Sequence, residues 1–349
     1  MRRLPIYFLI DVSESMVGDP IEQVQQGMRN IIQELRMDPY ALETVFVSVI
    51  AFAGKAKVLI PLTELYKFYP PTFPIGGGTS LGAGLDCLMN DINTSVQKTT
   101  TETKGDWKPI IFLFTDGTPT DNPTSAIQEW NKKYRRHCNL VAVSIGKNVN
   151  PRILGQLTDN ILRLNETDAQ TFKEFFKWVT ASIKTSSMSV SEYADEDIKL
   201  SKVDGINLEK VNPQTEEYID ENFAVFLGKC QTTKSLYLIK FAKRSKPLNI
   251  EGLENFNSSD FKLVGAYPIN EMEYNELSVA NTPGPNINTI ELIGQPTCPC
   301  CGNQLGFVVC ECGRIFCAGE NPVNQCPWCG MQGELGSISG GMDIQRTRG

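Results

Sequence analysis

The feature that most constrains this chain is an apolar segment near its start that stops abruptly at an aspartate. Residues 6–10 are apolar and predict a buried strand. Asp11 follows directly, and Ser13 and Ser15 come after it at a spacing of two. Apolar residues then recur every three or four positions over residues 21–35, which predicts a helix. The three oxygen-bearing side chains are therefore expected in a strand-to-helix loop, where open α/β sheets bind their ligands.

The residues of this loop allow two interpretations. Carboxylate and hydroxyl oxygens that converge on one point suit a hard cation such as Mg²⁺. The alternative is a plain helix start, in which Ser13 and Ser15 cap the helix and Asp11 complements its dipole. Two later segments of the chain favour the metal site.

Each later segment adds an oxygen ligand next to a predicted strand or helix. Glycines at 76–78 lead into Thr79, and a second apolar run over residues 110–115 ends at Asp116. Asp-x-Ser-x-Ser, a loop threonine and a strand-end Thr-Asp-Gly together resemble the von Willebrand factor A domain. In that family these positions form a metal-ion-dependent adhesion site. The resemblance implies a site made of Asp11, Ser13, Ser15, Thr79 and Asp116.

The resemblance also implies how the metal is held. Ser13 and Ser15, and sometimes Thr79, would coordinate Mg²⁺ directly through neutral hydroxyls. Asp11 and Asp116 would act mainly through bound waters, and Mn²⁺ could replace Mg²⁺ in the cell. With few anionic ligands, the ion would keep much of its charge and seek one more anionic oxygen from a partner's carboxylate or phosphate. Such a site binds proteins, so we expect that this protein is not an enzyme.

The chain is too long for a single hydrophobic core, and its patterns predict several parts. Strand and helix patterns alternate over residues 1–187, and residues 44–52 and 57–61 look like a hairpin with an antiparallel edge strand. We expect a doubly wound, mainly parallel α/β domain of the von Willebrand factor A type over 1–187, an acidic linker over 188–222, a β-rich and zinc-ribbon-like metal-binding domain over 223–335, and a disordered tail over 336–349.

Composition narrows the choice of partners and of compartment. The chain of 349 residues has 40 acidic and 33 basic residues, and its net charge of -7 argues against nonspecific binding to nucleic acid or anionic membranes. No signal peptide is visible, because Arg2 and Arg3 precede only a seven-residue stretch before Asp11. No apolar run approaches the length of a membrane span. We therefore expect a cytoplasmic protein whose partners are other proteins.

An uneven distribution of cysteines predicts a second metal centre. Eight of the eleven cysteines lie between Cys298 and Cys329. The others, Cys87, Cys138 and Cys230, are scattered, and we expect them to be small core residues. A dense local cluster without a secretion signal points to metal binding rather than to disulfides.

The cysteine cluster contains two matched knuckles of the sequence Cys-Pro-x-Cys-Gly, at 298–302 and 326–330. In a zinc ribbon, two such knuckles supply four sulfurs to one structural ion. Cys310, Cys312 and Cys317 lie between them and leave the grouping open, because they could form a second site or Cys312 and Cys317 could join one knuckle. Iron–sulfur ligation is the alternative chemistry. We expect one or two Zn²⁺ ions, with the candidate ligands Cys298, Cys301, Cys310, Cys312, Cys317, Cys326 and Cys329.

An adhesion-site domain followed by these cysteine motifs resembles the TerY family of bacterial tellurium-resistance-associated proteins. Its members are associated with a protein phosphatase of the PP2C type and a protein kinase. The resemblance therefore implies a scaffold or effector in a phosphorylation-linked stress response. The alternative is an Mg²⁺-dependent phosphoester hydrolase that activates water. Against the hydrolase, the single histidine, His137, lies on a predicted exposed basic stretch and no catalytic triad pattern is evident.

Overall fold

A computed structural model describes most of the chain, which divides into two compact units. The first unit consists mainly of residues 1–219 and the second mainly of residues 220–349. The residues described are 2–102, 104–145, 151–164, 175, 177–184, 209–210, 223–247, 257–279, 284–319, 321–336 and 341–347. No helix in these ranges is long and apolar enough to cross a membrane.

The first unit is built on a mixed, mostly parallel sheet. The described strands follow the order β3-β2-β1-β4-β5-β6-β7, and the central five run parallel while the edge strands β3 and β7 are antiparallel. Their bounds are β1 Leu4–Asp11, β2 Val45–Phe52, β3 Ala56–Glu64, β4 Ile110–Thr115, β5 Asn139–Ile145, β6 Ile161–Leu164 and β7 Glu209–Lys210. The predicted parallel sheet with an antiparallel edge hairpin is confirmed.

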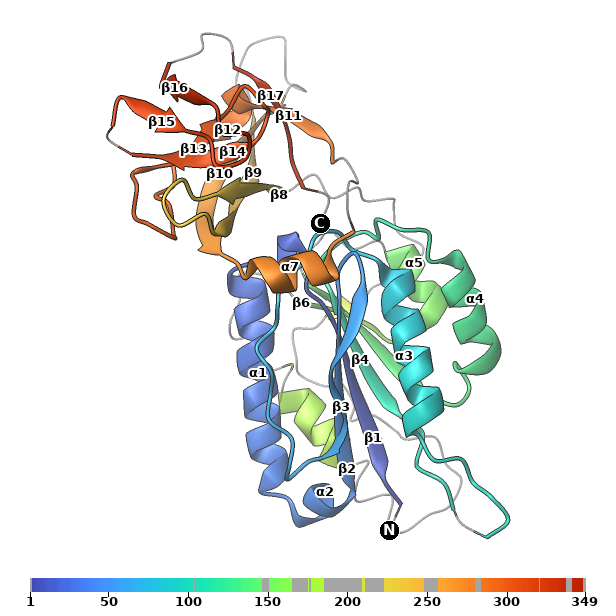
Figure 1. Cartoon of the computed structure of the whole chain (residues 1–349). Coiled ribbons are helices and arrows are strands. Elements are labelled where there is room, and N and C mark those ends of the chain that lie inside the picture. The colour runs from blue at the N-terminus through green and yellow to red at the C-terminus, as the bar shows by residue number, and fades with distance from the viewer. Residues whose placement is uncertain are drawn as a thin grey trace. The chain divides into compact units, whose positions relative to one another are not determined.

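Helices cover both faces of this sheet, which explains why its central strands read as continuous apolar runs. All eight residues of β1 are buried. Helix α1 lies on one side of the strands and α3 and α4 on the other (Figure 1). Phe8 and Phe112 stack with their ring centroids 5.7 Å apart, while Tyr7 and Leu9 join Trp130 in the core on the opposite face. The helices are α1 Asp19–Arg36, α2 Pro39–Thr44, α3 Leu81–Ser95, α4 Thr124–Lys133 and α5 Pro151–Leu157, with a short 3-10 turn at Glu14–Met16.

A closing helix of this unit is described only in part. Its sequence pattern is an apolar face made of Phe172, Phe175, Phe176, Val179 and Ile183. Residues 177–184 are helical, and Phe175, Val179 and Ile183 are buried. Phe175 packs edge-on against Phe114 of β4, with the ring centroids 5.8 Å apart. These residues therefore face the sheet, as their spacing predicts. Phe172 and Phe176, which the same pattern includes, lie outside the described residues.

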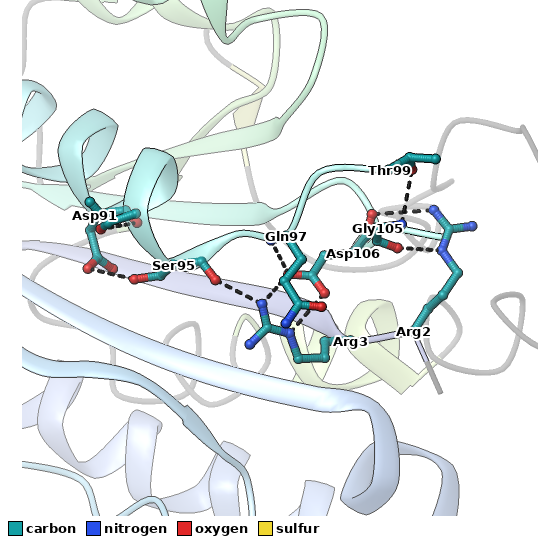
Figure 2. A network of polar contacts seen from close by, with 9 residues as sticks. Arg2, Arg3, Asp91, Ser95, Gln97, Thr99, Gly105 and Asp106 are labelled. Atoms are coloured by element: carbon teal, nitrogen blue, oxygen red, sulfur yellow. Dashed lines mark hydrogen bonds and ion pairs between the residues drawn. The ribbon is translucent and has the colours of Figure 1, made fainter. Parts of the chain in front are cut away.

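An ion pair attaches the loop after α3 to the start of β1. The side chain of Asp106 is only 1% exposed, and its Oδ2 lies 2.5 Å from Nη2 of Arg3. The same guanidinium nitrogen donates to the carbonyl of Ser95 at 2.8 Å, and the backbone N–H of Gln97 donates to Asp106 at 2.8 Å (Figure 2). Both ends of the polar segment 96–106 are thus fixed to the edge of the domain.

The second unit is rich in β-structure, as predicted. Its main sheet has the strand order β12-β10-β9-β8-β14-β13, and the rings of Phe226, Phe241 and Phe307 meet edge to face at its centre. The strands are β8 Phe223–Lys229, β9 Leu236–Pro247, β10 Asn257–Pro268, β11 Asn286–Asn288, β12 Leu292–Ile293, β13 Leu305–Val309, β14 Ile315–Ala318, β15 Val323–Gln325, β16 Gln332–Glu334 and β17 Asp343–Gln345, and the helix α7 spans Glu271–Leu277.

Two expectations about connecting segments need comment. The tail over 336–349 is not wholly disordered, because β17 pairs with β11 and Ile344 is only 2% exposed within the core of the unit. The prediction failed because one buried isoleucine in a glycine-rich stretch gives too short an apolar pattern. Most of the acidic linker over 188–222 lies outside the described residues, although Glu209–Lys210 pair with β6.

Candidate metal sites

The first candidate site lies where β1 and β4 end side by side. Ile10 of β1 pairs with Phe114 of β4, so Asp11 and Asp116 both follow at the same edge of the sheet. The hydroxyl of Thr115 donates a hydrogen bond of 2.6 Å to Oδ2 of Asp11. This contact orients the aspartate that the adhesion-site pattern begins with. Sequence analysis gave Thr115 no role, although it belongs to the Thr-Asp-Gly motif.

Thr79 reaches the same edge through two loop contacts. The N–H of Ser80, the next residue, donates to the carbonyl of Ala53 directly after β2, the strand beside β1. The N–H of Thr79 donates to the hydroxyl of Thr120 at 2.9 Å, and the N–H of Thr120 donates to the carbonyl of Thr79 at 2.8 Å. The loop before α3 is therefore held against the loop that follows Asp116.

The serine pair has a spacing that suits a magnesium ion. The hydroxyl oxygens of Ser13 and Ser15 are 3.1 Å apart. Adjacent ligands of an octahedral Mg²⁺ lie about 2.9 Å apart at its usual bond lengths. Asp11 is the last residue of β1, Ser13 and Ser15 lie beside and within the 3-10 turn that follows it, Asp116 follows β4, and Thr79 precedes α3. Their side chains offer only oxygen ligands. Their assignment as metal ligands stays a prediction.

The second unit holds two separate groups of four cysteines, and in each group all four sulfurs lie within 4.8 Å of one another. Cluster A consists of Cys230, Cys298, Cys301 and Cys317. In this cluster, Sγ of Cys317 is 3.7 Å from Sγ of both Cys230 and Cys301. The N–H of Gln231 points at the sulfur of Cys317 at 3.2 Å. Such N–H···S contacts stabilise thiolates and are typical of metal-binding knuckles.

Cluster B consists of Cys310, Cys312, Cys326 and Cys329. Its sulfur–sulfur distances are 3.6 Å between Cys310 and Cys329 and 3.9 Å between Cys312 and Cys326. A tetrahedral Zn²⁺ with ordinary Zn–S bonds separates its sulfurs by about 3.8 Å. A disulfide would need about 2 Å, and an iron–sulfur cube would place each thiolate on a different iron. Both clusters therefore fit a single tetrahedral ion.

The observed grouping answers one question that the sequence left open and corrects one expectation. The two Cys-Pro-x-Cys-Gly knuckles do not share an ion, because Cys298 and Cys301 lie in cluster A while Cys326 and Cys329 lie in cluster B. Cys230, which we expected to be a simple core residue, is the fourth member of cluster A. The number of candidate ligands could have indicated a missing residue, because two sites of four ligands need eight cysteines and only seven were predicted.

Cys230 was missed because it lies in a degenerate knuckle. Its N–H donates to the carbonyl five residues on, and its carbonyl accepts from Lys234 four residues on, as in the other two knuckles. Gly302 and Gly330 hold the fifth position there with φ of 81° and 78°, and Lys234 holds it here with φ of 61°. Thr233 stands where the second cysteine would be. Without that cysteine and glycine, the turn carries no recognisable motif.

The remaining cysteines lie outside both clusters. Burial raises the pKa of Cys138 to about 12, so its thiol stays protonated as a core residue. Cys87 is half-buried, and burial likewise raises its pKa. Cys300, between two ligands of cluster A, has its sulfur 3.9 Å from the carbonyl of Leu236. The expectation that Cys87 and Cys138 are not ligands agrees with their absence from both clusters.

The architecture and both groups of candidate ligands define the protein class. The von Willebrand factor type A domain family matches residues 6–178, the part that contains the sheet and the Asp-x-Ser-x-Ser loop. The family described as the TerY-C metal binding domain matches residues 220–349, which include both cysteine clusters. The chain thus contains a von Willebrand factor type A domain over residues 6–178 and a TerY-C metal binding domain over residues 220–349.

Individual proteins resemble the chain only in part. The human inter-alpha-trypsin inhibitor heavy chain H6 is 28% identical over 123 residues, which are 34% of this chain and 9% of that protein. The pilus adhesin SpaC of Lactobacillus rhamnosus GG is 14% identical with a TM-score of 0.43, over 53% of this chain and 31% of its own. Proximal thread matrix protein 1 of the mussel byssus is 17% identical with a TM-score of 0.37, over 51% of this chain and 46% of its own. That structure has a zinc-occupied MIDAS motif. The chain thus spans less than half of each, and similarity this low carries no functional inference.

Proposed function

We propose that the protein is a metal-dependent interaction or scaffold protein and not an enzyme. Its von Willebrand factor A domain would hold Mg²⁺ or Mn²⁺ with Asp11, Ser13, Ser15, Thr79 and Asp116. Three observed contacts support this proposal: Thr115 donates to Asp11, Thr120 holds the Thr79 loop, and the hydroxyl oxygens of Ser13 and Ser15 lie 3.1 Å apart. A hard ion at that edge would supply an open coordination position to a partner.

The ligand chemistry supports an anionic oxygen as the group recognised. Ser13, Ser15 and Thr79 are neutral ligands, so a bound Mg²⁺ would retain much of its charge after they coordinate it. A partner's Asp or Glu carboxylate would complete its coordination, and a phosphate oxygen would do so equally well. Both alternatives follow from the same chemistry, and the binding experiment below separates them.

We further propose that clusters A and B hold Zn²⁺ in a structural role. Four thiolates in a closed tetrahedral arrangement leave no open position for a substrate. The pathway proposal rests on the TerY-type resemblance: the protein would act in the cytoplasm in a bacterial stress response associated with tellurium resistance, together with a PP2C-type phosphatase and a protein kinase.

The test is a quantitative pull-down from the native cytosol in buffer with Mg²⁺, comparing the wild type with the double variant Ser13→Ala/Thr79→Ala. Thr94→Ala, on the exposed face of α3, is the matched control. We expect partners to be lost with the double variant and kept with the control. Chelators are avoided because they would also remove zinc.

Adding inorganic phosphate or glutamate to the same pull-down identifies the recognised group. Competition by phosphate alone would indicate a phosphorylated partner, and competition by glutamate would indicate an acidic side chain. Retention of the same partners by the double variant, after calorimetry has shown that it no longer binds Mg²⁺, would disprove the adhesion-site proposal.

A further inference from the structure

The two cysteine clusters are interleaved along the chain. In sequence order, cluster A contributes Cys230, Cys298 and Cys301, cluster B contributes Cys310 and Cys312, cluster A then contributes Cys317, and cluster B ends with Cys326 and Cys329. Cys317 therefore lies between the two halves of cluster B. The chain segment that joins the ligands of each cluster therefore contains ligands of the other cluster.

The strand β14 is the segment that both clusters share. Ile315 and Cys317 belong to the core around cluster A, whereas Phe316 and Ala318 belong to the small core around cluster B. Successive side chains of a strand point to opposite faces. Each face of β14 thus packs on one cluster, and moving the strand would disturb both.

The partner strand β13 shows the same division. Phe307 and Val309 pack against the core around cluster A, and Val308 packs against the core around cluster B. The turn between β13 and β14 carries Cys310 and is closed by the N–H of Cys310, which donates to the carbonyl of Arg314 at 2.9 Å. One hairpin therefore presents ligands to cluster B at its turn and to cluster A through Cys317 of β14.

Trp328 adds a direct link between the clusters. It belongs to the second knuckle of cluster B, and its indole N–H donates to the backbone carbonyl of Ile315 at 2.7 Å. Its ring also contacts two cations, with Nζ of Lys229 5.2 Å and the guanidinium of Arg314 4.9 Å from the ring centre. Lys229 immediately precedes Cys230 of cluster A. Trp328 of the cluster B knuckle thus contacts residues next to the cluster A ligands in the chain.

We propose that the two clusters bind zinc cooperatively, with the β13–β14 hairpin as the coupling element. This inference rests on the proposed zinc occupancy of both clusters. An ion in either cluster fixes the hairpin, so the conformational entropy of ordering it is lost only once and the second ion binds more tightly. We expect a coupling factor of about tenfold, within the usual range for linked sites.

A comparison of the full chain with two single-site variants measures this factor. Zinc affinity is determined by competition with a chromophoric chelator for the wild type, for Cys230→Ala, in which only cluster B keeps four ligands, and for Cys329→Ala, in which only cluster A keeps four ligands. We expect the overall two-zinc constant of the wild type to exceed the product of the two single-site constants by about tenfold. Equality of the two values would overturn the coupling and leave the zinc sites themselves intact.

Two further variants keep the experiment decisive. Cys300→Ala removes a thiol outside both clusters and should match the wild type. Trp328→Phe keeps all eight ligands but removes the indole N–H, so native mass spectrometry at limiting zinc should show more one-zinc chain than in the wild type. If Trp328→Phe showed the same proportions of zinc-bound species as the wild type, the coupling would be contradicted. This test does not depend on whether Cys230→Ala folds. A wild-type chain that binds no zinc at all would overturn the zinc proposal together with this one.

Discussion

Thr115 is the residue whose single contact does most to shape the adhesion site. Its hydroxyl donates to Asp11 at 2.6 Å, and a valine would keep the side-chain shape without the donor. We predict that Thr115→Val lowers Mg²⁺ affinity about tenfold, the usual effect of losing a hydrogen bond to a group that positions a metal. Isothermal titration calorimetry with Mg²⁺ measures it.

Thr158 offers the matched control for this variant. It is also a buried threonine in the same unit, and its hydroxyl donates to the carbonyl of Leu140 at 2.6 Å. Thr158→Val should cost about 1 kcal/mol of unfolding free energy, as a lost buried hydrogen bond does, and leave Mg²⁺ affinity unchanged. Equal Mg²⁺ affinities for the two variants would remove the positioning role assigned to Thr115.

Lys234 carries backbone strain beside cluster A. Its φ of 61° is a left-handed conformation that glycine adopts without penalty and other residues adopt at about 1–2 kcal/mol. We predict that Lys234→Gly keeps or slightly raises the stability of the second unit, whereas Lys234→Val lowers it by about 1–2 kcal/mol because of its branched Cβ. Urea unfolding of the zinc-loaded chain compares the two variants. A valine variant as stable as the wild type would show that the strain is not real.

Among single residues, a site role can be predicted from the sequence where the residue belongs to a complete motif, and cannot where the motif is incomplete. Asp11 and Asp116 follow long apolar strands, so their place at the sheet edge could be inferred from pattern alone. Cys230 stands in a knuckle whose second cysteine and glycine are replaced by Thr233 and Lys234. Its role follows from backbone hydrogen bonds, which no single-sequence pattern specifies.

Among the elements, the loop after α3 is held by several polar contacts, and its buried ion pair is the one whose loss leaves a charge unpaired. Removing Arg3 would leave the carboxylate of Asp106, which is 1% exposed, without its counter-charge. We predict that Arg3→Ala lowers the free energy of unfolding of the first unit by about 1–3 kcal/mol, between the costs of breaking an exposed and a fully buried pair, because Asp106 is buried while Arg3 is 22% exposed. Chemical denaturation followed by tryptophan fluorescence measures this loss.

An exposed ion pair in the same unit provides the comparison. Lys133 lies 2.7 Å from Glu129 on α4, with both side chains well exposed. Lys133→Ala should therefore leave the unfolding free energy nearly unchanged, because solvent screens an exposed pair. Similar losses for Lys133→Ala and Arg3→Ala would mean that burial of Asp106 does not set the strength of its ion pair.

Long periodic elements were the predictable part of the fold, and short ones were not. The strands of the first unit and helix α1 have enough apolar repeats to be recognised. Helix α7 has seven residues and β17 only three, too few for periodicity to show. The β13–β14 hairpin could not be predicted because its strands have only five and four residues, although both of its faces contact small cores.

For the whole molecule, two compact units with separate cores should unfold separately. The second unit contains both cysteine clusters, and four unbound thiols at each cluster do not hold its segments together. We predict two calorimetric transitions, of which a zinc-selective chelator in Mg²⁺ buffer lowers or abolishes only one. Added zinc should restore it. A chelator that shifts both transitions equally would contradict separate unfolding.

The affinity of the second unit for zinc should also depend on pH. Burial raises the pKa of Cys298 to about 12, so in the metal-free chain its thiol is protonated at neutral pH. Burial also acts to raise the pKa of Cys230, but hydrogen bonds from Thr233 outweigh it and lower that pKa to about 6. Zinc must displace the protons that remain, so its affinity falls as pH falls. Calorimetry in two buffers of different ionisation enthalpy counts the released protons, and no difference between the buffers would refute the prediction.

The interleaved cysteines also limit how this protein can be dissected or reused. A segment cut at the obvious motif boundaries, 298–329, looks like a portable zinc ribbon, yet it lacks Cys230 and the strand β8 against which β14 pairs. Grafted onto another protein, it would complete one tetrathiolate site and leave three reactive thiols at the other. Protein engineers who want this metal centre must therefore transplant the sheet along with it.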